Sequence, residues 1–109
     1  MRNRLIVLSG VPGSGKSTYC QAYKDLYEAH GIKVNIVSSD EIRMELFGRY
    51  DNFENEKLVW EIFRAKAYEY SKQDHSVTIL DATTLTNKHR YNYALQYKKF
   101  YKQIYLVVM

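Results

Sequence analysis

Near its N-terminus the chain reads Gly10-Val11-Pro12-Gly13-Ser14-Gly15-Lys16-Ser17, which matches the pattern G-x-x-x-x-G-K-[ST] at every fixed position. The apolar run Leu5-Ile6-Val7-Leu8 comes directly before it, and a helix is expected from Lys16 to about His30, stopped by Gly31. Glycines let the backbone curl so that several N–H groups point at one cluster of phosphate oxygens, and the helix N-terminus adds partial positive charge. The stretch therefore predicts a loop that binds the phosphates of a nucleoside triphosphate.

The lysine and the hydroxyl that close this loop have expected roles. A lysine at this place reaches the β- and γ-phosphates, and the hydroxyl that follows it ligates Mg²⁺. We therefore expect Lys16 to contact the phosphates, Ser17 to bind the metal, and ATP and Mg²⁺ to be the cofactors. The predicted nucleotide-binding residues are Gly10, Pro12, Gly13, Ser14, Gly15, Lys16, Ser17 and Thr18.

The composition is that of a small globular domain. The 109 residues, 46% hydrophobic and 26% charged, predict a single domain spanning 1–109. No apolar run approaches the roughly 20 residues needed to cross a membrane, and the N-terminus does not resemble a signal peptide. The single cysteine, Cys20, excludes an internal disulfide. We expect no membrane partner and a cytoplasmic location.

Charge and aromatic content point weakly to a polyanionic partner. The formal net charge is +4, and the chain has 11 tyrosines. Some of these rings are expected either to stack on bases or, more simply, to serve as core and surface rings.

Apolar runs and helical periodicity alternate along the chain. Strands are expected at 4–9, 33–37, 77–80 and 103–108. Helices are expected at 16–30, 41–47 and 54–73, and from Thr86 or Asn87 to about Phe100. Ser38 and Glu41 have the spacing of a capping box at the start of the second helix. In the third, a stripe at helical spacing predicts a buried face: Val59, Ile62, Phe63, Ala67 and Tyr70.

This alternation predicts an α/β fold of the P-loop NTPase type, with four parallel strands in the order 2-3-1-4 and helices on both faces of the sheet. The last apolar strand stops near Met109 with nothing to cover it. We therefore expect the 109 residues to be a truncated or minimal domain that lacks the final strand, and to associate through the uncovered strand edge.

Polar residues follow the strands where ligands bind in such sheets, beyond the carboxyl ends. Asp81 follows an apolar strand, as does the acid that contacts the Mg²⁺ shell in phosphate-loop proteins, although many strands also end in Asp at a turn. Asp40 follows Ser38 and Ser39, and either caps the next helix or accepts the proton of an attacking hydroxyl. Arg43 lies on the same helix face as Asp40 and is expected either to hold a phosphate of the acceptor or to be a solvated surface arginine.

Three strings together carry a family resemblance: the loop 10–18, Ser39-Asp40-Glu41-Ile42-Arg43, and 80–90, which begins Leu80-Asp81-Ala82-Thr83-Thr84. In this order and at these intervals they resemble the 5′-hydroxyl polynucleotide kinase branch of the P-loop kinases, of the phage and zeta-toxin-like type. The resemblance extends from Leu5 to about Val108. It implies a kinase that transfers the γ-phosphate of ATP to the 5′-hydroxyl at a nucleic acid end.

The resemblance also implies roles for single residues. Lys16 would stabilise the transferring phosphoryl group, and Asp40 would be the general base. Arg43 would hold the adjacent phosphate of the acceptor, and Asp81 would order the magnesium shell or fix Arg43. Thr83 and Arg90 would line the acceptor groove. Because the arginine-bearing lid of such kinases is missing, we expect the 109 residues alone to turn over poorly.

Two other functions fit the same residues. One is a P-loop kinase that acts on a hydroxyl of a small molecule or nucleotide sugar. The other is a nucleotide-binding module without catalysis.

Overall fold

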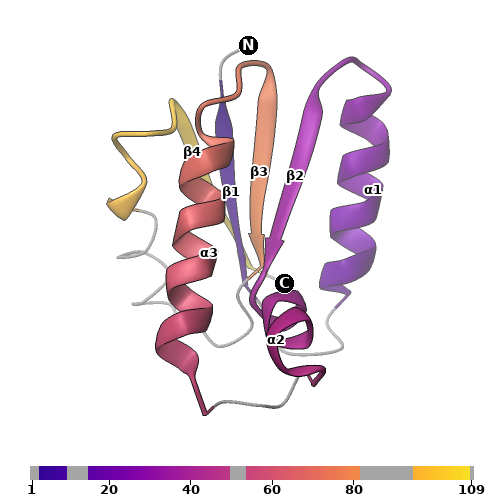
Figure 1. Ribbon diagram of the computed structural model, residues 1–109. Helices are drawn as coiled ribbons and strands as arrows, with labels where there is room; N and C mark the ends of the chain where they lie inside the picture. Colours follow the sequence, from indigo (N-terminus) through magenta and orange to yellow (C-terminus); the bar gives the residue numbers. More distant parts are fainter. Residues whose placement is uncertain (1–2, 10–14, 50–53, 82–94, 109) are drawn as a thin grey trace.

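The chain folds around a parallel β-sheet (Figure 1). The computed structural model describes residues 3–9, 15–49, 54–81 and 95–108. In chain order the elements are β1 (Arg4–Ser9), α1 (Lys16–Glu28), β2 (Lys33–Ser38), α2 (Ser39–Phe47), α3 (Glu56–Tyr70), β3 (Ser76–Asp81) and β4 (Gln103–Val108). The sheet order is β2-β3-β1-β4 and every pairing is parallel, which confirms the α/β fold and the predicted strand order.

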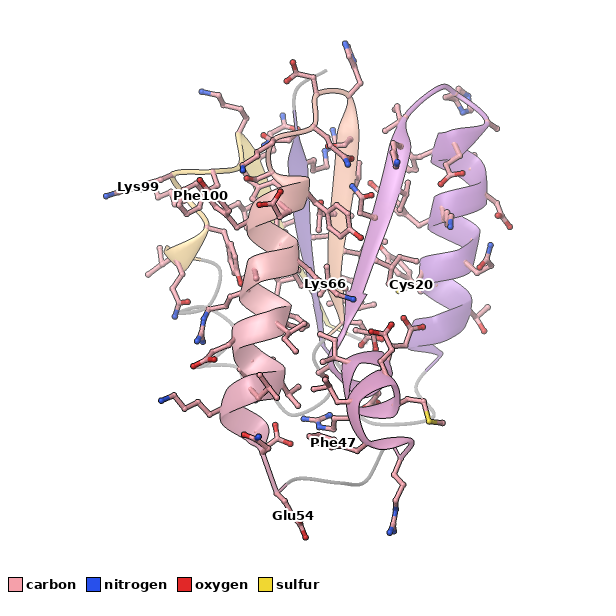
Figure 2. The ribbon with its side chains drawn as sticks, viewed as in Figure 1. Cys20, Phe47, Glu54, Lys66, Lys99 and Phe100 are labelled. Atoms are coloured by element: carbon pink, nitrogen blue, oxygen red, sulfur yellow. The ribbon has the colours of Figure 1, made fainter. Side chains whose placement is uncertain are left out.

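Alternation along β1 divides the core between the two faces of the sheet, because successive side chains of a strand point in opposite directions. Leu5 and Val7 belong to a cluster that packs against α2 and α3. Ile6 and Leu8 belong to a second cluster, which packs against α1 and includes Cys20. Helices therefore cover both faces, as the sequence predicts, and Cys20 lies between α1 and the sheet (Figure 2).

The predicted core stripe of α3 is confirmed. Val59, Phe63 and Ala67 are buried, and Ile62 and Tyr70 pack partly buried against the same cluster. Trp60 lies beside this stripe and packs edge-on against Phe63, with ring centroids 5.1 Å apart.

Helix boundaries depart from the expected ones by a few residues. The first helix ends at Glu28. Turns at His30 and Gly31 follow it and reverse the chain direction before β2, and Gly31 has a φ of 78°. The third runs over Glu56–Tyr70, shorter than the expected 54–73. The second begins at Ser39, two residues before the expected start, and ends at Phe47, where Gly48, with φ 70°, caps it.

The last predicted helix lies mostly outside the described residues. Its described end is helical only at Leu95 and Gln96, followed by a turn at 97–100, so the helix does not reach Phe100. Asn3 holds the backbone beyond that point: its side-chain nitrogen donates to the Phe100 carbonyl at 2.6 Å, and its oxygen accepts from the Lys102 N–H at 3.0 Å. These bonds direct the chain into β4.

Candidate functional site

Strand register brings the polar strand ends together at one edge of the sheet. Asp81, the last residue of β3, is paired with Leu8 of β1 on one side and with Ser38 of β2 on the other. Gly10, where the glycine-rich stretch starts, comes two residues after Leu8, and Asp40 comes two residues after Ser38. The helix α2, which carries Asp40, lies at the end of the sheet to which the strand arrows point (Figure 1). The three strand ends therefore form one site.

The glycine-rich stretch joins β1 to α1, as expected. The first strand ends at Ser9, and α1 begins at Lys16. Gly15 has φ 89°, a left-handed conformation suited to glycine, and its carbonyl accepts the first helical hydrogen bond, from the Tyr19 N–H at 2.9 Å. Thr18 is exposed in the first turn of α1. The helix N-terminus is therefore directed at the same edge as Asp40 and Asp81, where anions are favoured.

Several of the predicted site residues fall outside the described part of the structure. These are Gly10, Pro12, Gly13 and Ser14, the side chains of Lys16 and Ser17, and both predicted acceptor-groove residues, Thr83 and Arg90. Their roles stay predictions.

Ser38, and not Asp40, caps α2. The Ser38 hydroxyl accepts a hydrogen bond from the Glu41 N–H at 3.3 Å, and the backbone of Ser38 is extended, as an N-cap requires. Of the two roles expected for Asp40, capping the helix or accepting a proton, the capping role therefore belongs to Ser38. Asp40 lies in the first turn of α2 with 37% of its side chain exposed.

Arg43 is the most deeply enclosed large side chain near the site, with 0% exposure. Its Nη1 donates to Asp40 Oδ1 at 2.8 Å. Its Nε and Nη2 donate to the two carboxylate oxygens of Glu56, each at 2.9 Å. The expectation of a solvated surface arginine is therefore wrong: the helical spacing places Arg43 on the face of α2 that packs against α3, where a charge needs paired partners.

Glu56 is the site residue that the sequence did not reveal. It begins α3, thirteen positions after Arg43, and 31% of its side chain is exposed. Spacing rules within a helix link residues three or four apart, so they predict the Asp40–Arg43 pair and cannot predict a contact between helices. The one available signal was an acidic residue in the first turn of a predicted helix, which is common for reasons unrelated to a site.

The residues at this edge suit a magnesium nucleotide. Asp81 is half-buried at the end of β3 and offers a carboxylate beside β1. Mg²⁺ with a nucleotide needs only one or two protein oxygens, since phosphates and water supply the others. Within the described ranges there is no group of three His, Cys, Asp or Glu that could hold a metal, and such a set is not needed for this use.

Comparisons with known proteins agree with the fold. The sequence profile of a family described as AAA domain matches residues 5–109. The chain belongs to this family. A search of curated protein sequences gave no match for this AAA domain chain.

Among solved structures, the AAA domain chain is similar to a chain of the structure titled "Structure of Pnkp1/Rnl/Hen1 complex". The TM-score is 0.80 at 23% identity over 98% of this chain. The similar region is 35% of the other chain, so this chain spans about a third of the length of that relative. The family match shows an AAA domain, and the structural match agrees with the predicted P-loop-type α/β fold. None of the described helices has the length and apolar character needed to cross a membrane.

Proposed function

We propose that this chain is an ATP-dependent kinase domain that transfers the γ-phosphate to the 5′-hydroxyl of a polynucleotide. One observation carries the proposal: the register Leu8–Asp81–Ser38 puts Asp81 between the strand that leads into the phosphate loop and the strand that leads into α2. A donor loop, a carboxylate for the metal shell and a carboxylate for the acceptor are the parts that phosphoryl transfer needs.

On the donor side, Lys16 would contact the β- and γ-phosphates, and Ser17 with Asp81 would hold Mg²⁺. The metal neutralises charge on the phosphates when it is bound. On the acceptor side, Asp40 accepts the proton of the attacking hydroxyl. The oxygen of that hydroxyl bonds to the γ-phosphorus, and the bond between the γ-phosphorus and the oxygen it shares with the β-phosphate breaks, so that ADP leaves. The part-exposed carboxylate of Asp40 is open to a hydroxyl from solvent, and the hydrogen bond from Arg43 fixes one of its oxygens.

A nucleic acid acceptor is favoured by the resemblance of the three strings to polynucleotide kinases and by the net charge of +4. The similarity to a chain of the Pnkp1/Rnl/Hen1 complex supports the same acceptor. The rival acceptor is the hydroxyl of a small molecule, and binding without transfer is the rival outside catalysis.

The proposal is tested by transfer of labelled γ-phosphate to a 5′-hydroxyl oligonucleotide, with the full-length protein. We expect transfer, and we expect Asp40→Asn to lower kcat by about 100-fold or more while ATP affinity is retained, because the general base is lost and the donor loop is intact. Glu41→Gln, in the adjacent exposed position, is the matched control and should leave kcat unchanged.

Two results would contradict the proposal. ATP binding without transfer to any 5′-hydroxyl end would favour the binding module. Transfer to a sugar, with acceptor affinity that does not change with salt, would favour a small-molecule kinase, because nucleic acid binding weakens steeply with salt as counterions are released.

A further inference from the structure

We infer that Glu56 is a positioning residue of the kinase site, which holds Arg43 and through it the carboxylate of Asp40. The inference rests on the proposed function for what Asp40 does, and on the described geometry for how Asp40 is held.

The hydrogen bonds form a directed chain across two helices. The two carboxylate oxygens of Glu56, at the start of α3, accept hydrogen bonds from Nε and Nη2 of Arg43. This bidentate geometry fixes the plane of the guanidinium. The third nitrogen, Nη1, is thereby aimed at Asp40 Oδ1 at 2.8 Å. The orientation of Asp40 therefore depends on Arg43, and the orientation of Arg43 depends on Glu56.

Exposure distinguishes the middle of this chain from its ends. The Arg43 side chain has 0% exposure, whereas Asp40 and Glu56 have 37% and 31%. The Asp40 end is open to solvent, and it comes two residues after Ser38, which pairs with Asp81 at the carboxyl end of β3. The guanidinium of Arg43 is therefore enclosed between two carboxylates, of which Asp40 is the one that follows β2 at the strand ends.

A simple tie between α2 and α3 does not account for the arrangement. The same two helices carry a second ion pair, from Lys66 Nζ to Glu45 Oε2 at 3.7 Å, which is exposed and does not involve Asp40. Phe47 also packs from α2 against the core cluster that α3 helps to build (Figure 2). The bidentate pair thus adds what these contacts lack, a fixed direction for the Asp40 carboxylate.

The test compares Glu56→Gln with Glu45→Gln in the full-length protein. Glutamine keeps the size of Glu56 and offers one acceptor oxygen in place of two, so Arg43 loses its two-point support. We expect kcat for transfer to a 5′-hydroxyl oligonucleotide to fall about 10- to 100-fold, as expected for a misplaced catalytic group, with KM for ATP and for the acceptor nearly unchanged. Glu45→Gln, which removes the other pair between these helices, should change neither constant.

A second pair of variants separates positioning from structure. In an Asp40→Asn background, Glu56→Gln should cause no further loss, because Glu56 acts through Asp40. Arg43→Lys, which keeps the charge and loses the fork, should resemble Glu56→Gln in lowering kcat without raising KM for the acceptor. An unchanged kcat in Arg43→Lys, or a further loss from Glu56→Gln in the Asp40→Asn background, would overturn the inference.

A readout without catalysis distinguishes failure of this inference from failure of the proposed function. In the wild type, NMR should show a sharp Arg43 Nε–H signal, slow to exchange with water. Glu56→Gln should broaden or shift that signal and shift the Asp40 carboxylate carbon, whereas Glu45→Gln should move neither. If transfer is absent in the wild type and these shifts are present, the kinase proposal fails and Glu56 still positions Asp40. If Glu56→Gln leaves both signals in place, the inference fails whatever the activity.

Discussion

Two buried polar side chains in the described part of this protein, Arg43 and Tyr101, make contacts that fix more than the pair itself. Arg43 joins two helices and fixes a carboxylate at the site. Tyr101, buried beneath α3, donates its hydroxyl hydrogen to the Ala67 carbonyl and so ties the segment before β4 to α3. A buried hydroxyl or guanidinium without such partners would cost free energy, so these contacts help to select one arrangement of the helices on the sheet.

Tyr101 makes stability depend on pH in the alkaline range. Burial raises the pKa of Tyr101 to about 12, above the value of about 10 for a tyrosine in an unfolded chain. Between these two values the unfolded chain releases the proton and the folded chain keeps it. The stabilisation is therefore fully present below about pH 10 and is lost as the pH rises towards 12.

Tyr101→Phe should lower the free energy of unfolding at neutral pH by about 1 kcal/mol, the usual net worth of one hydrogen bond. It should also flatten the decline of stability above pH 10, as measured by urea unfolding from pH 8 to 11.5. Burial also raises the pKa of Tyr23 to about 12, so Tyr23 contributes to the same decline of stability. Tyr23→Phe is therefore the comparison variant, because it retains the contribution of Tyr101. An unchanged decline in Tyr101→Phe would contradict the role assigned to it.

At the scale of elements, two adjacent serines at the junction of β2 and α2 have different environments. The Ser38 hydroxyl caps the helix, whereas the Ser39 hydroxyl, with 0% exposure, has no hydrogen-bond partner among the described residues. Ser38→Ala should cost about 1 kcal/mol of stability through loss of the cap. Ser39→Ala should change stability by less than about 0.5 kcal/mol or raise it, because an unsatisfied buried hydroxyl is removed.

Thermal and urea unfolding of the two alanine variants measure this difference directly. They share the residue type, the substitution and the junction, so each is the control for the other. Equal losses in both would show that the cap is not what stabilises the start of α2.

The sequence predicted elements well where local patterns fix them. The short runs predicted as strands correspond to β1, β2 and β3 in the structure. The capping spacing of Ser38 and Glu41 predicted the start of α2 to within two residues. Helix ends were less predictable, because turns at 29–31 and the hydrogen bonds of Asn3 to distant backbone set them. For the site, the strand ends followed from topology, but the Arg43–Glu56 pair depends on how α2 packs on α3, which no local spacing encodes.

At the scale of the whole molecule, the sheet places the site and an open edge at different positions. The candidate site lies at the carboxyl ends of β2, β3 and β1. In the sheet order β4 comes after these three strands, at one edge of the sheet. Within the described residues β4 pairs only with β1, and Tyr105 and Leu106 of β4, which point to opposite faces of the sheet, have 47% and 40% exposure. An edge strand with exposed apolar side chains is a template for pairing with another strand.

We propose that two copies of this 109-residue chain pair through β4. A substitution that introduces one charge on this strand should prevent the pairing. Leu106→Lys should shift the 109-residue chain from dimer to monomer in size-exclusion chromatography with light scattering, since a lysine on an edge strand opposes strand addition. Leu26→Lys, at an apolar residue of α1 with 58% exposure, should leave the mass unchanged. Because β4 is separate from the strand ends that carry Asp40 and Asp81, Leu106→Lys should also leave ATP affinity unaltered. A wild-type chain that is monomeric at all concentrations, or a Leu26→Lys variant that dissociates as readily, would count against pairing through β4.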